Sequence, residues 1–400
     1  MGVRLEAVAI AGSLLPWLIL MRFAIDAHAI GRHLTGNEVY VRSLLKSFAA
    51  LDDESEFVTY FSAEDARQWI ADRFHARQVS ANPFLRLGLE LPMRLRQDRP
   101  DLLHVQYTAP LACPVPIVVS VHDVSFIEHP DYFPRLRAWQ LRRTVSRTMR
   151  CAARILTGSE FSRDAIVRNY GQACAEKIVV VPNAAASGLR PISRESAAAA
   201  VRARFRFAKP FVLSVGDLQP RKNPIGLISA FAELIRAYPQ LPHHLLLAGK
   251  DTWFSPRVHE AARQSGLAGR IQFAGFVTDD ELLHLYNACD LFVFPSFYEG
   301  FGLPVLEAMA CGRAVACSRT SAMPEVADGA GILFDPYSTA EIVRAMADLL
   351  LDAELRARME RLGLQRASRF SWHATAQKTL EVYRQVAEHK RAKAREYVHR

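Results

Sequence analysis

Several patterns that mark particular classes of protein are missing from this 400-residue chain. Its six cysteines form no C-x-x-C pair and have no histidine at zinc-site spacing, which excludes zinc-ribbon and dithiol redox motifs. We interpret the cysteines as small buried residues of a protein in a reducing compartment. No D-x-D metal motif, internal repeat or low-complexity tract occurs, so the sequence predicts neither a metal site of that type nor a repeat or disordered protein.

A hydrophobic run long enough to span a membrane is also missing. Residues 7–20 are apolar but are interrupted by glycine, serine and proline, and they fall short of the roughly 20 residues that a spanning helix needs. No small-x-small cleavage site of a signal peptide follows them. Because residues 21–27 resemble a buried strand, we expect either that Met21 is the true start or that residues 1–20 are a dispensable leader. A short membrane anchor is the alternative.

The composition is that of a soluble enzyme with a basic surface. Hydrophobic residues make up 50% of the chain and charged residues 23%, and the net charge is +9. The length exceeds one ordinary core and suits two domains. The positive charge favours anionic partners such as nucleotides, nucleic acid or anionic lipid without choosing among them. We expect a cytoplasmic protein.

Short apolar segments alternate with helical patterns along nearly the whole chain. They show little polar alternation, as is typical of parallel strands covered by helices on both faces. The expected strands are 22–27, 57–61, 102–106, 117–122, 155–157, 177–181, 211–215, 244–248, 270–273, 291–294, 314–316 and 332–334. The expected helices are 37–51, 195–205, 224–238, 279–288 and 372–397. The predicted fold class is α/β, with two doubly wound Rossmann-like domains.

The domain boundary is expected in the connector between Pro182 and Pro210. We predict an N-terminal domain over residues 21–190, a C-terminal domain over 191–375 and a C-terminal helix over 376–400. Ligands of open α/β sheets bind beyond the carboxyl ends of the strands, so we expect the site in a cleft between the domains.

The strongest site signal runs from Glu299 to Gly312, after a predicted strand and into a helix. Its glycines let the backbone approach a ligand closely, and the helix N-terminus offers N–H groups to an anion. Glu299 in the loop and Glu307 on the helix supply carboxylates that accept hydrogen bonds from sugar or ribose hydroxyls. A glycine-rich turn with one solvated and one capping glutamate is the alternative.

A second signal, residues 216–223, also follows a strand and opens a helix. Arg221 and Lys222 stand at the helix start, where the dipole disfavours cations. The pair is explained if a doubly charged anion binds there, and diphosphate fits, with Arg221 as a fork and Lys222 as a point charge. Two exposed cations on a turn are the alternative.

Two positions in the N-terminal half complete the predicted site. His122 ends a predicted strand, at the edge that faces an inter-domain cleft, although most histidines are structural or surface groups. Gly36 precedes a helix start, where a phosphate or sugar could approach, although ordinary turn chemistry explains it nearly as well.

Together these segments resemble the retaining family-4 glycosyltransferases of the two-domain GT-B fold, from about Met21 to Tyr383. The landmarks are the Glu-x7-Glu and Gly-x4-Arg-Lys-Asn segments, His122-Asp123, Gly158-Ser159-Glu160-Phe161-Ser162 and Val180-Val181-Pro182-Asn183. Many members have Gly-x-Gly-Arg-Tyr where this chain has Gly36-Asn37-Glu38-Val39-Tyr40, which leaves the contact of this loop open.

The resemblance implies a role for each matched position. Glu299 would contact the transferred sugar, Glu307 the donor ribose, and Arg221 and Lys222 the leaving diphosphate. The implied catalytic residues are Glu299, His122, Arg221 and Lys222, and the implied donor-binding residues are Glu307, Phe301, Gly302, Leu303, Val277 and Gly36.

The implied function is the transfer of a mannose- or glucose-type hexose from a nucleotide diphosphate sugar to a glycan or lipid-linked acceptor, with retention of configuration, in cell-envelope polysaccharide synthesis. We expect no metal and no cofactor, because the cation pair and a helix N-terminus would stabilise the departing diphosphate. The preferred route is a same-face transfer in which the leaving phosphate takes the acceptor proton.

Two arginine-rich amphipathic segments, 84–96 and 134–154, indicate peripheral contact with anionic membrane at its inner face; solvated helix surfaces are the alternative. Two other enzyme types of this fold, sugar-nucleotide epimerases and phosphorylases, are alternative functions. A nucleic-acid-binding protein is disfavoured because no aromatic stacking platform accompanies the basic residues.

Overall fold

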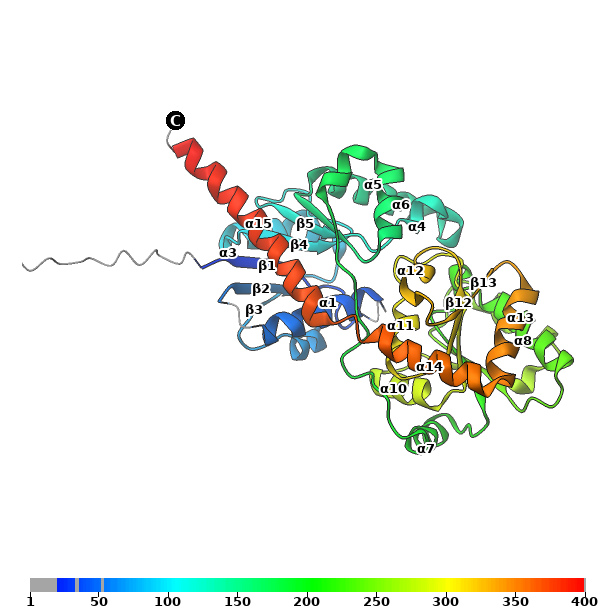
Figure 1. The fold of residues 1–400 in the computed structure, drawn as a ribbon. Helices are drawn as coiled ribbons and strands as arrows, with labels where there is room; N and C mark the ends of the chain where they lie inside the picture. Colours follow the sequence, from blue (N-terminus) through cyan, green and yellow to red (C-terminus); the bar gives the residue numbers. More distant parts are fainter. Residues whose placement is uncertain (1–19, 33–35, 52–53, 399–400) are drawn as a thin grey trace, which may run out of the picture.

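The computed structural model describes residues 20–32, 36–51 and 54–398, and these form two α/β domains (Figure 1). The predicted leader, up to residue 19, lies outside the described residues. Each domain is built around one parallel sheet, and the first sheet is complete before the second begins. The predicted fold class, α/β with two doubly wound Rossmann-like domains, is confirmed.

The N-terminal sheet has seven strands in the order β3-β2-β1-β4-β5-β6-β7, and each neighbouring pair is parallel. The strands are β1 (Arg22–Asp26), β2 (Glu56–Phe61), β3 (His75–Gln78), β4 (Leu102–Gln106), β5 (Ile117–Ser120), β6 (Arg154–Thr157) and β7 (Ile178–Val180). The sequence did not predict β3, because this edge strand is polar and mostly exposed. The predicted strand 117–122 ends earlier than expected, so His122 lies in the loop that follows β5.

The C-terminal sheet has six parallel strands in the order β10-β9-β8-β11-β12-β13, all of which were predicted. They are β8 (Phe211–Val215), β9 (His244–Ala248), β10 (Ile271–Gly275), β11 (Leu291–Phe294), β12 (Val315–Ser318) and β13 (Ile332–Phe334). The order in which the chain adds strands reverses at β8, because β9 and β10 lie on one side of it and β11, β12 and β13 on the other. Ligands of such sheets bind at this point of reversal.

Helices cover both faces of each sheet. The first domain contains α1 (Gly36–Ala50), η1 (Glu64–Trp69), α2 (Pro83–Leu85), the π-helical turn η2 (Arg86–Glu90), α3 (Leu91–Asp98), α4 (Ser125–Glu128), η3 (Pro130–Tyr132), α5 (Arg135–Cys151), α6 (Glu160–Tyr170) and η4 (Gln172–Lys177). The second contains α7 (Arg194–Phe205), η5 (Pro220–Lys222), α8 (Pro224–Ala237), α9 (Ser255–Gln264), η6 (Ala268–Arg270), α10 (Asp279–Ala288), α11 (Leu303–Ala310), α12 (Met323–Ala327), α13 (Thr339–Leu351) and α14 (Ala353–Ala367).

Alternate strand residues enter different cores, which explains why the strand segments are apolar throughout. In β1, Phe23 and Ile25 pack with α1, whereas Ala24 packs on the opposite face with α3 and α5. The second sheet divides in the same way between a core with α7, α10 and α11 and a core with α8, α9 and α13. Full burial on both faces stabilises the sheets and fixes the strand ends that form the site.

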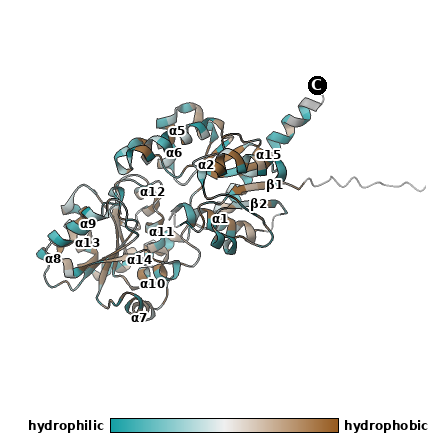
Figure 2. Cartoon of the chain, turned by 180° about the vertical axis from the view of Figure 1, so that it is seen from behind, coloured by the Kyte–Doolittle hydropathy of each residue, from teal (hydrophilic) through white to brown (hydrophobic). Residues whose placement is uncertain are grey.

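The last helix, α15 (Trp372–Val398), returns to the first domain after the second is complete (Figure 1). Trp372, Ala376 and Tyr383 belong to the same core as α1, so this helix joins the two ends of the chain into one domain. None of the described helices is both long and apolar enough to cross a membrane. Figure 2 shows polar residues along most helices, while α2 is strongly hydrophobic.

Candidate active site

A cavity of about 490 Å³ lies between the two domains, beyond the carboxyl ends of strands from both sheets. It is lined by the loops after β5, β8 and β11 together with the first turns of α1 and α11. The structure brings all the predicted site residues to the lining of this one cavity: Gly36, His122, Arg221, Lys222, Val277, Glu299, Phe301, Gly302, Leu303 and Glu307. Their individual roles stay predictions.

The centre of the cavity holds a compact charge cluster. Arg221 Nη1 lies 2.7 Å from Glu299 Oε2, and Lys222 Nζ lies 2.7 Å from Glu299 Oε1. Arg221 also donates to the carbonyl of Tyr298 at 2.8 Å, and Lys222 Nζ lies 4.7 Å from the centre of the Phe294 ring. The cluster combines two cations from η5 with one carboxylate from the β11–α11 loop, and Asp123 and Asp217 also attract Arg221 and Lys222, respectively.

The protonation states of this cluster follow from burial and mutual attraction. Burial by itself raises the pKa of Glu299, but Arg221 and Lys222 outweigh burial and bring the pKa down to about 2. Burial also lowers the pKa of Lys222, an effect that the Glu299 carboxylate partly offsets. Glu299 is therefore ionised at neutral pH and can accept hydrogen bonds from sugar hydroxyls once an anion takes over the cations.

Glu307 stands on α11 in a less polar setting. Its side chain is buried, and Tyr286 on α10 donates a hydrogen bond to it at 2.9 Å. Burial raises the pKa of Glu307 to about 7, although the Tyr286 hydrogen bond acts in the opposite direction. A carboxyl group with a pKa near neutrality, on the helix that follows the loop of residues 299–302, is suited to a bidentate contact with a diol.

The loop before α11 shows why its glycines matter. Gly302 has φ +99°, a conformation that residues with a side chain rarely adopt, and a Cβ there would also displace the Met323 methyl group, which lies 2.2 Å away, so glycine is strongly favoured at this position. No side chain caps the first turn of α11, so the N–H of Leu303 is available for an anion. The Phe301 side chain packs in the core against Phe370, which leaves its backbone for the cavity.

His122 is held from three sides in the loop after β5. Its Nε2 lies 3.2 Å from Gln106 Oε1, and its ring packs edge-on against Tyr40 and Tyr107 at 4.6 Å and 5.7 Å between centres. Burial lowers the pKa of His122 to about 4. The ring is therefore neutral at pH 7. With Nε2–H donating to Gln106 Oε1, its Nδ1 can accept a hydrogen bond from a ligand but offers it no charge.

Gly36 and Val277 lie at the edge of the cavity, in different domains. Gly36 is the first residue of α1, and the loop residues 33–35 before it lie outside the described part of the chain. Val277 precedes Thr278, which caps α10. Between these edges Arg42 of α1 forms an ion pair with Asp279 of α10, so the two domains touch across the mouth of the cavity.

Several lining residues were missed by the sequence reasoning. Lys250 follows β9 and pairs with Asp217 at 3.7 Å, and its strand-end position could have identified it. Gln106 does not line the cavity but contacts His122 from the end of β4, and a lone glutamine carries little signal in the sequence. The Arg42–Asp279 pair joins residues of different domains, and nothing in the local sequence indicates it. Among the described residues no group of three or more His, Cys, Asp and Glu is arranged to hold a metal ion.

Comparison with known proteins agrees with this geometry. Residues 201–366 match the sequence model of the family described as Glycosyl transferases group 1, and residues 34–185 match Glycosyltransferase Family 4. O-antigen chain mannosyltransferase B of Escherichia coli is 34% identical over 67% of this chain and 70% of that protein. A D-inositol 3-phosphate glycosyltransferase of Streptomyces bingchenggensis is 28% identical over 87% of this chain and 84% of that protein.

Solved structures share the fold. Anabaena Alr3699/HepE in complex with UDP-glucose superposes with a TM-score of 0.73, at 21% identity, over 90% of this chain and 99% of that one. Sucrose-phosphate synthase from Thermosynechococcus elongatus gives a TM-score of 0.73 at 19% identity over 92% of this chain and 99% of that one. Two facing Rossmann-like domains of this kind define the GT-B class of glycosyltransferase. Within that class, the chain belongs to glycosyltransferase family 4.

Proposed function

We propose that this glycosyltransferase moves a hexose from a nucleotide diphosphate sugar to a glycan or lipid-linked acceptor, with retention of configuration and without a metal ion. The observation that supports this is the pairing of Arg221 and Lys222 with Glu299 on the cleft, next to the unobstructed first turn of α11. In this arrangement a bound diphosphate would replace Glu299 as the ion-pair partner of Arg221 and Lys222. The Glu299 carboxylate could then accept hydrogen bonds from the sugar hydroxyls.

The reaction follows from the charges that develop. The bond between the anomeric carbon and the phosphate oxygen breaks, and negative charge grows on the departing diphosphate. Arg221, Lys222 and the α11 N-terminus stabilise that charge without having to reorganise. The acceptor oxygen bonds to the anomeric carbon on the same face, and its proton passes to the departing phosphate. Glu299 and neutral His122 hold the sugar hydroxyls while the oxocarbenium-like carbon forms.

The donor proposed is a mannose-type sugar nucleotide, and the process is polysaccharide assembly. This rests on relatives whose names state mannosyl transfer. Besides the O-antigen enzyme, the serotype-specific mannosyltransferase WbdA of Escherichia coli is 38% identical over 44% of this chain, although the match spans only 22% of that longer protein. A tritiated-sugar transfer assay with several donors and a crude glycan acceptor tests the donor. Release of diphosphate without an acceptor, or an altered sugar on the recovered nucleotide, would instead favour hydrolysis or epimerisation.

Metal independence is tested by the same assay in EDTA. The cation pair replaces a bridging metal in the proposed mechanism, so the transfer rate should be unchanged by the chelator. A loss of activity in EDTA that Mg²⁺ or Mn²⁺ restores would overturn this part of the proposal.

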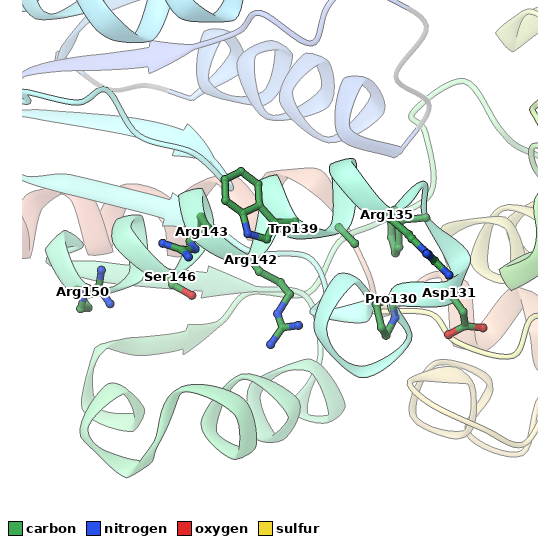
Figure 3. Close-up of a pocket in the computed structure, with 10 residues that line it drawn as sticks. Pro130, Asp131, Arg135, Trp139, Arg142, Arg143, Ser146 and Arg150 are labelled. Atoms are coloured by element: carbon green, nitrogen blue, oxygen red, sulfur yellow. The ribbon is translucent and has the colours of Figure 1, made fainter.

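The acceptor is proposed to arrive from an anionic membrane at the inner face, and α5 provides the surface. The helix contains six arginines and no acidic residue. Among residues 20–32, 36–51 and 54–398, none of these arginines forms an ion pair with a carboxylate. Figure 3 shows several of them around a groove of about 940 Å³ on the outer side of α5. The lining includes Arg135, Trp139, Arg142, Arg143 and Arg150.

Exposed apolar side chains extend this surface to the α2–α3 segment. Leu111 is 67% exposed and joins the two parts, because its N–H donates to Leu87 and its carbonyl accepts from Arg147. Phe84 of α2 is 79% exposed, and Leu136 of α5 is 76% exposed. Unneutralised arginines beside exposed apolar groups fit an anionic lipid surface. The inner side of α5, through Arg137 and Leu141, lines the catalytic cavity, so a membrane-bound acceptor would be close to the site.

Vesicle sedimentation tests the membrane surface. The wild-type protein should sediment with phosphatidylglycerol vesicles at low salt and not with phosphatidylcholine vesicles. Changing Arg142, Arg143 and Arg150 to glutamine should abolish binding, whereas the same change at Arg202, Arg236 and Arg358, exposed arginines of the second domain, should not. Equal binding by both triple variants would refute a specific surface, and no binding by the wild type would refute membrane contact.

A further inference from the structure

The segment Gly158-Ser159-Glu160-Phe161-Ser162 has no assigned role in sugar transfer, yet it makes several contacts with the second domain near the site. It leads from β6 into α6 in the first domain. Ser159 Oγ donates to the carbonyl of Gly300 at 2.6 Å, and Ser162 Oγ lies 2.9 Å from the same carbonyl oxygen. Gly300 belongs to the second domain and directly follows Glu299. Two buried hydroxyls of one domain therefore converge on the reactive loop of the other.

Gly300 also lies directly against the backbone of His122. A Cβ on Gly300 would lie 1.9 Å from the His122 carbonyl oxygen and 2.9 Å from Asp123 Cβ. The His122 carbonyl in turn lies 3.0 Å from Ser162 Oγ. Ser162 thus touches backbone carbonyls on both sides of the cleft, one beside Glu299 and one on His122.

The neighbouring residues of the segment complete the fit. Gly158 packs closely beside the second domain, because a Cβ there would lie 3.2 Å from Asn183 Nδ2 and 3.4 Å from the Phe301 ring. The Phe161 ring packs against Tyr298 at 5.3 Å. The Glu325 carboxylate of the second domain accepts from the backbone N–H groups of Glu160 and Phe161, at the positive end of α6.

The loop is held from its own domain as well. The N–H of Glu299 donates to Ser321 Oγ at 3.0 Å, and the Glu299 carbonyl accepts from the N–H of Ala322 at 3.3 Å. These contacts persist whether or not the domains are together. The contacts from Ser159 and Ser162 exist only when the domains meet, so they are the ones that couple domain contact to the placement of Glu299.

We infer that Ser159 and Ser162 are positioning residues that hold the Gly300 carbonyl, and with it the neighbouring Glu299, against the His122 backbone where the two domains meet. We call Ser159, Ser162, Gly300 and the His122 carbonyl the domain joint. The inference rests on the proposed function of Glu299 and His122. The proposed diphosphate ligands Arg221 and Lys222 and the proposed ribose ligand Glu307 all lie in the second domain, so the joint should govern the transfer step and leave most of donor binding intact.

Gly300 provides a selective test of the joint. Its φ is not in the left-handed region, so alanine is compatible with the backbone there. The three atoms nearest to the added Cβ all belong to the first domain. Gly300→Ala therefore penalises the closed arrangement without straining the loop itself.

The experiment measures donor Kd by calorimetry and kcat for transfer in the full-length protein. For Ser162→Ala we expect kcat to fall by about tenfold while donor Kd stays within about twofold of wild type. For Gly300→Ala we expect a fall in kcat of about a hundredfold with the same unchanged Kd. Ser162→Thr keeps the hydroxyl and should restore most of the rate. Ser159 is also the N-cap of α6, so Ser159→Ala removes a helix cap as well as the contact with Gly300. Ser338→Ala, which removes the N-cap of α13, is the control for the loss of a cap alone.

The inference is overturned if Ser162→Ala and Gly300→Ala both keep kcat within about twofold of wild type, or if donor Kd weakens in step with kcat. If Ser162→Ala does not fold, Gly300→Ala and Ser162→Thr decide the question. Small-angle scattering tests the joint independently of the proposed function, because the radius of gyration is measured without any substrate. Gly300→Ala should enlarge the radius of gyration even if wild-type protein binds no nucleotide sugar, and an unchanged radius would refute the joint.

Discussion

Replacing Lys222 with methionine removes one cation from the proposed diphosphate site and keeps the length of the side chain. Lys222 Nζ lies 2.7 Å from Glu299 Oε1, but Arg221 Nη1 also lies 2.7 Å from Glu299 Oε2. The carboxylate therefore keeps a cationic partner in the variant. We expect a small change in the free energy of unfolding, since no buried charge is left unpaired.

The catalytic effect should be much larger than the effect on stability. Lys222 is one of two cations placed to stabilise the charge that develops on the diphosphate. Loss of one preorganised donor of this type reduces kcat by about 10²–10³, or about 3–4 kcal/mol of transition-state stabilisation. Steady-state release of nucleotide diphosphate, measured with saturating acceptor, gives kcat and KM separately.

Lys250→Met is the matched control for this prediction. Lys250 lines the same cavity but pairs with Asp217 at 3.7 Å, whereas Lys222 pairs with Glu299. We expect its kcat to fall by less than about tenfold. The reasoning fails if Lys222→Met keeps kcat/KM within about twofold of wild type, or if both lysine variants lose activity equally.

Four further predictions concern three residues, Glu307, Gly302 and His122. Because burial raises the pKa of Glu307 to about 7, its carboxylate forms as pH rises through that value. The donor Kd, measured by calorimetry, should therefore fall between about pH 6 and about pH 8 in the wild type and be independent of pH in Glu307→Gln. A flat profile in the wild type would contradict this. The folded-state pKa lies above the ordinary value of 4.5 for a glutamate, so the free energy of unfolding should fall as pH rises from 4.5 to about 7. This slope should be absent from denaturant titrations of Glu307→Gln. Gly302→Ala should destabilise the fold by about 1–3 kcal/mol, since φ is +99° and Met323 occupies the Cβ position; an unchanged Tm would refute the strain. Burial lowers the pKa of His122 to about 4, so any inflection of kcat near pH 6.5 should survive in His122→Asn, and its disappearance there would show that His122 titrates in the working range.

The sheets were predictable because their strands are buried on both faces. Apolar segments such as Phe211–Val215 and Leu291–Phe294 need no partner information to be recognised, and both are strands in the structure. The edge strand β3 was missed because its polar residues face solvent. Strand ends shifted where the apolar pattern continues into a loop, as in the turn that contains His122.

The site was predictable to the extent that each part is local. Glu299, Arg221 and His122 each follow a strand of a parallel sheet, and parallel strands direct their carboxyl ends to one edge. Contacts between the domains were not predictable from local sequence. The Arg42–Asp279 pair and the approach of Ser162 to Gly300 depend on how two separately folded sheets meet. The serines were visible in the sequence, but what they touch was not.

The central claim is that a cation pair, rather than a metal, holds the diphosphate of a nucleotide sugar in this cleft. The most direct measurement is calorimetric titration of the protein with a panel of nucleotide diphosphate sugars in EDTA, for the wild type and Lys222→Met. The account predicts clear binding of one donor by the wild type in EDTA and weaker binding by the variant. Binding that requires a divalent cation, or that is identical in the two proteins, would contradict it.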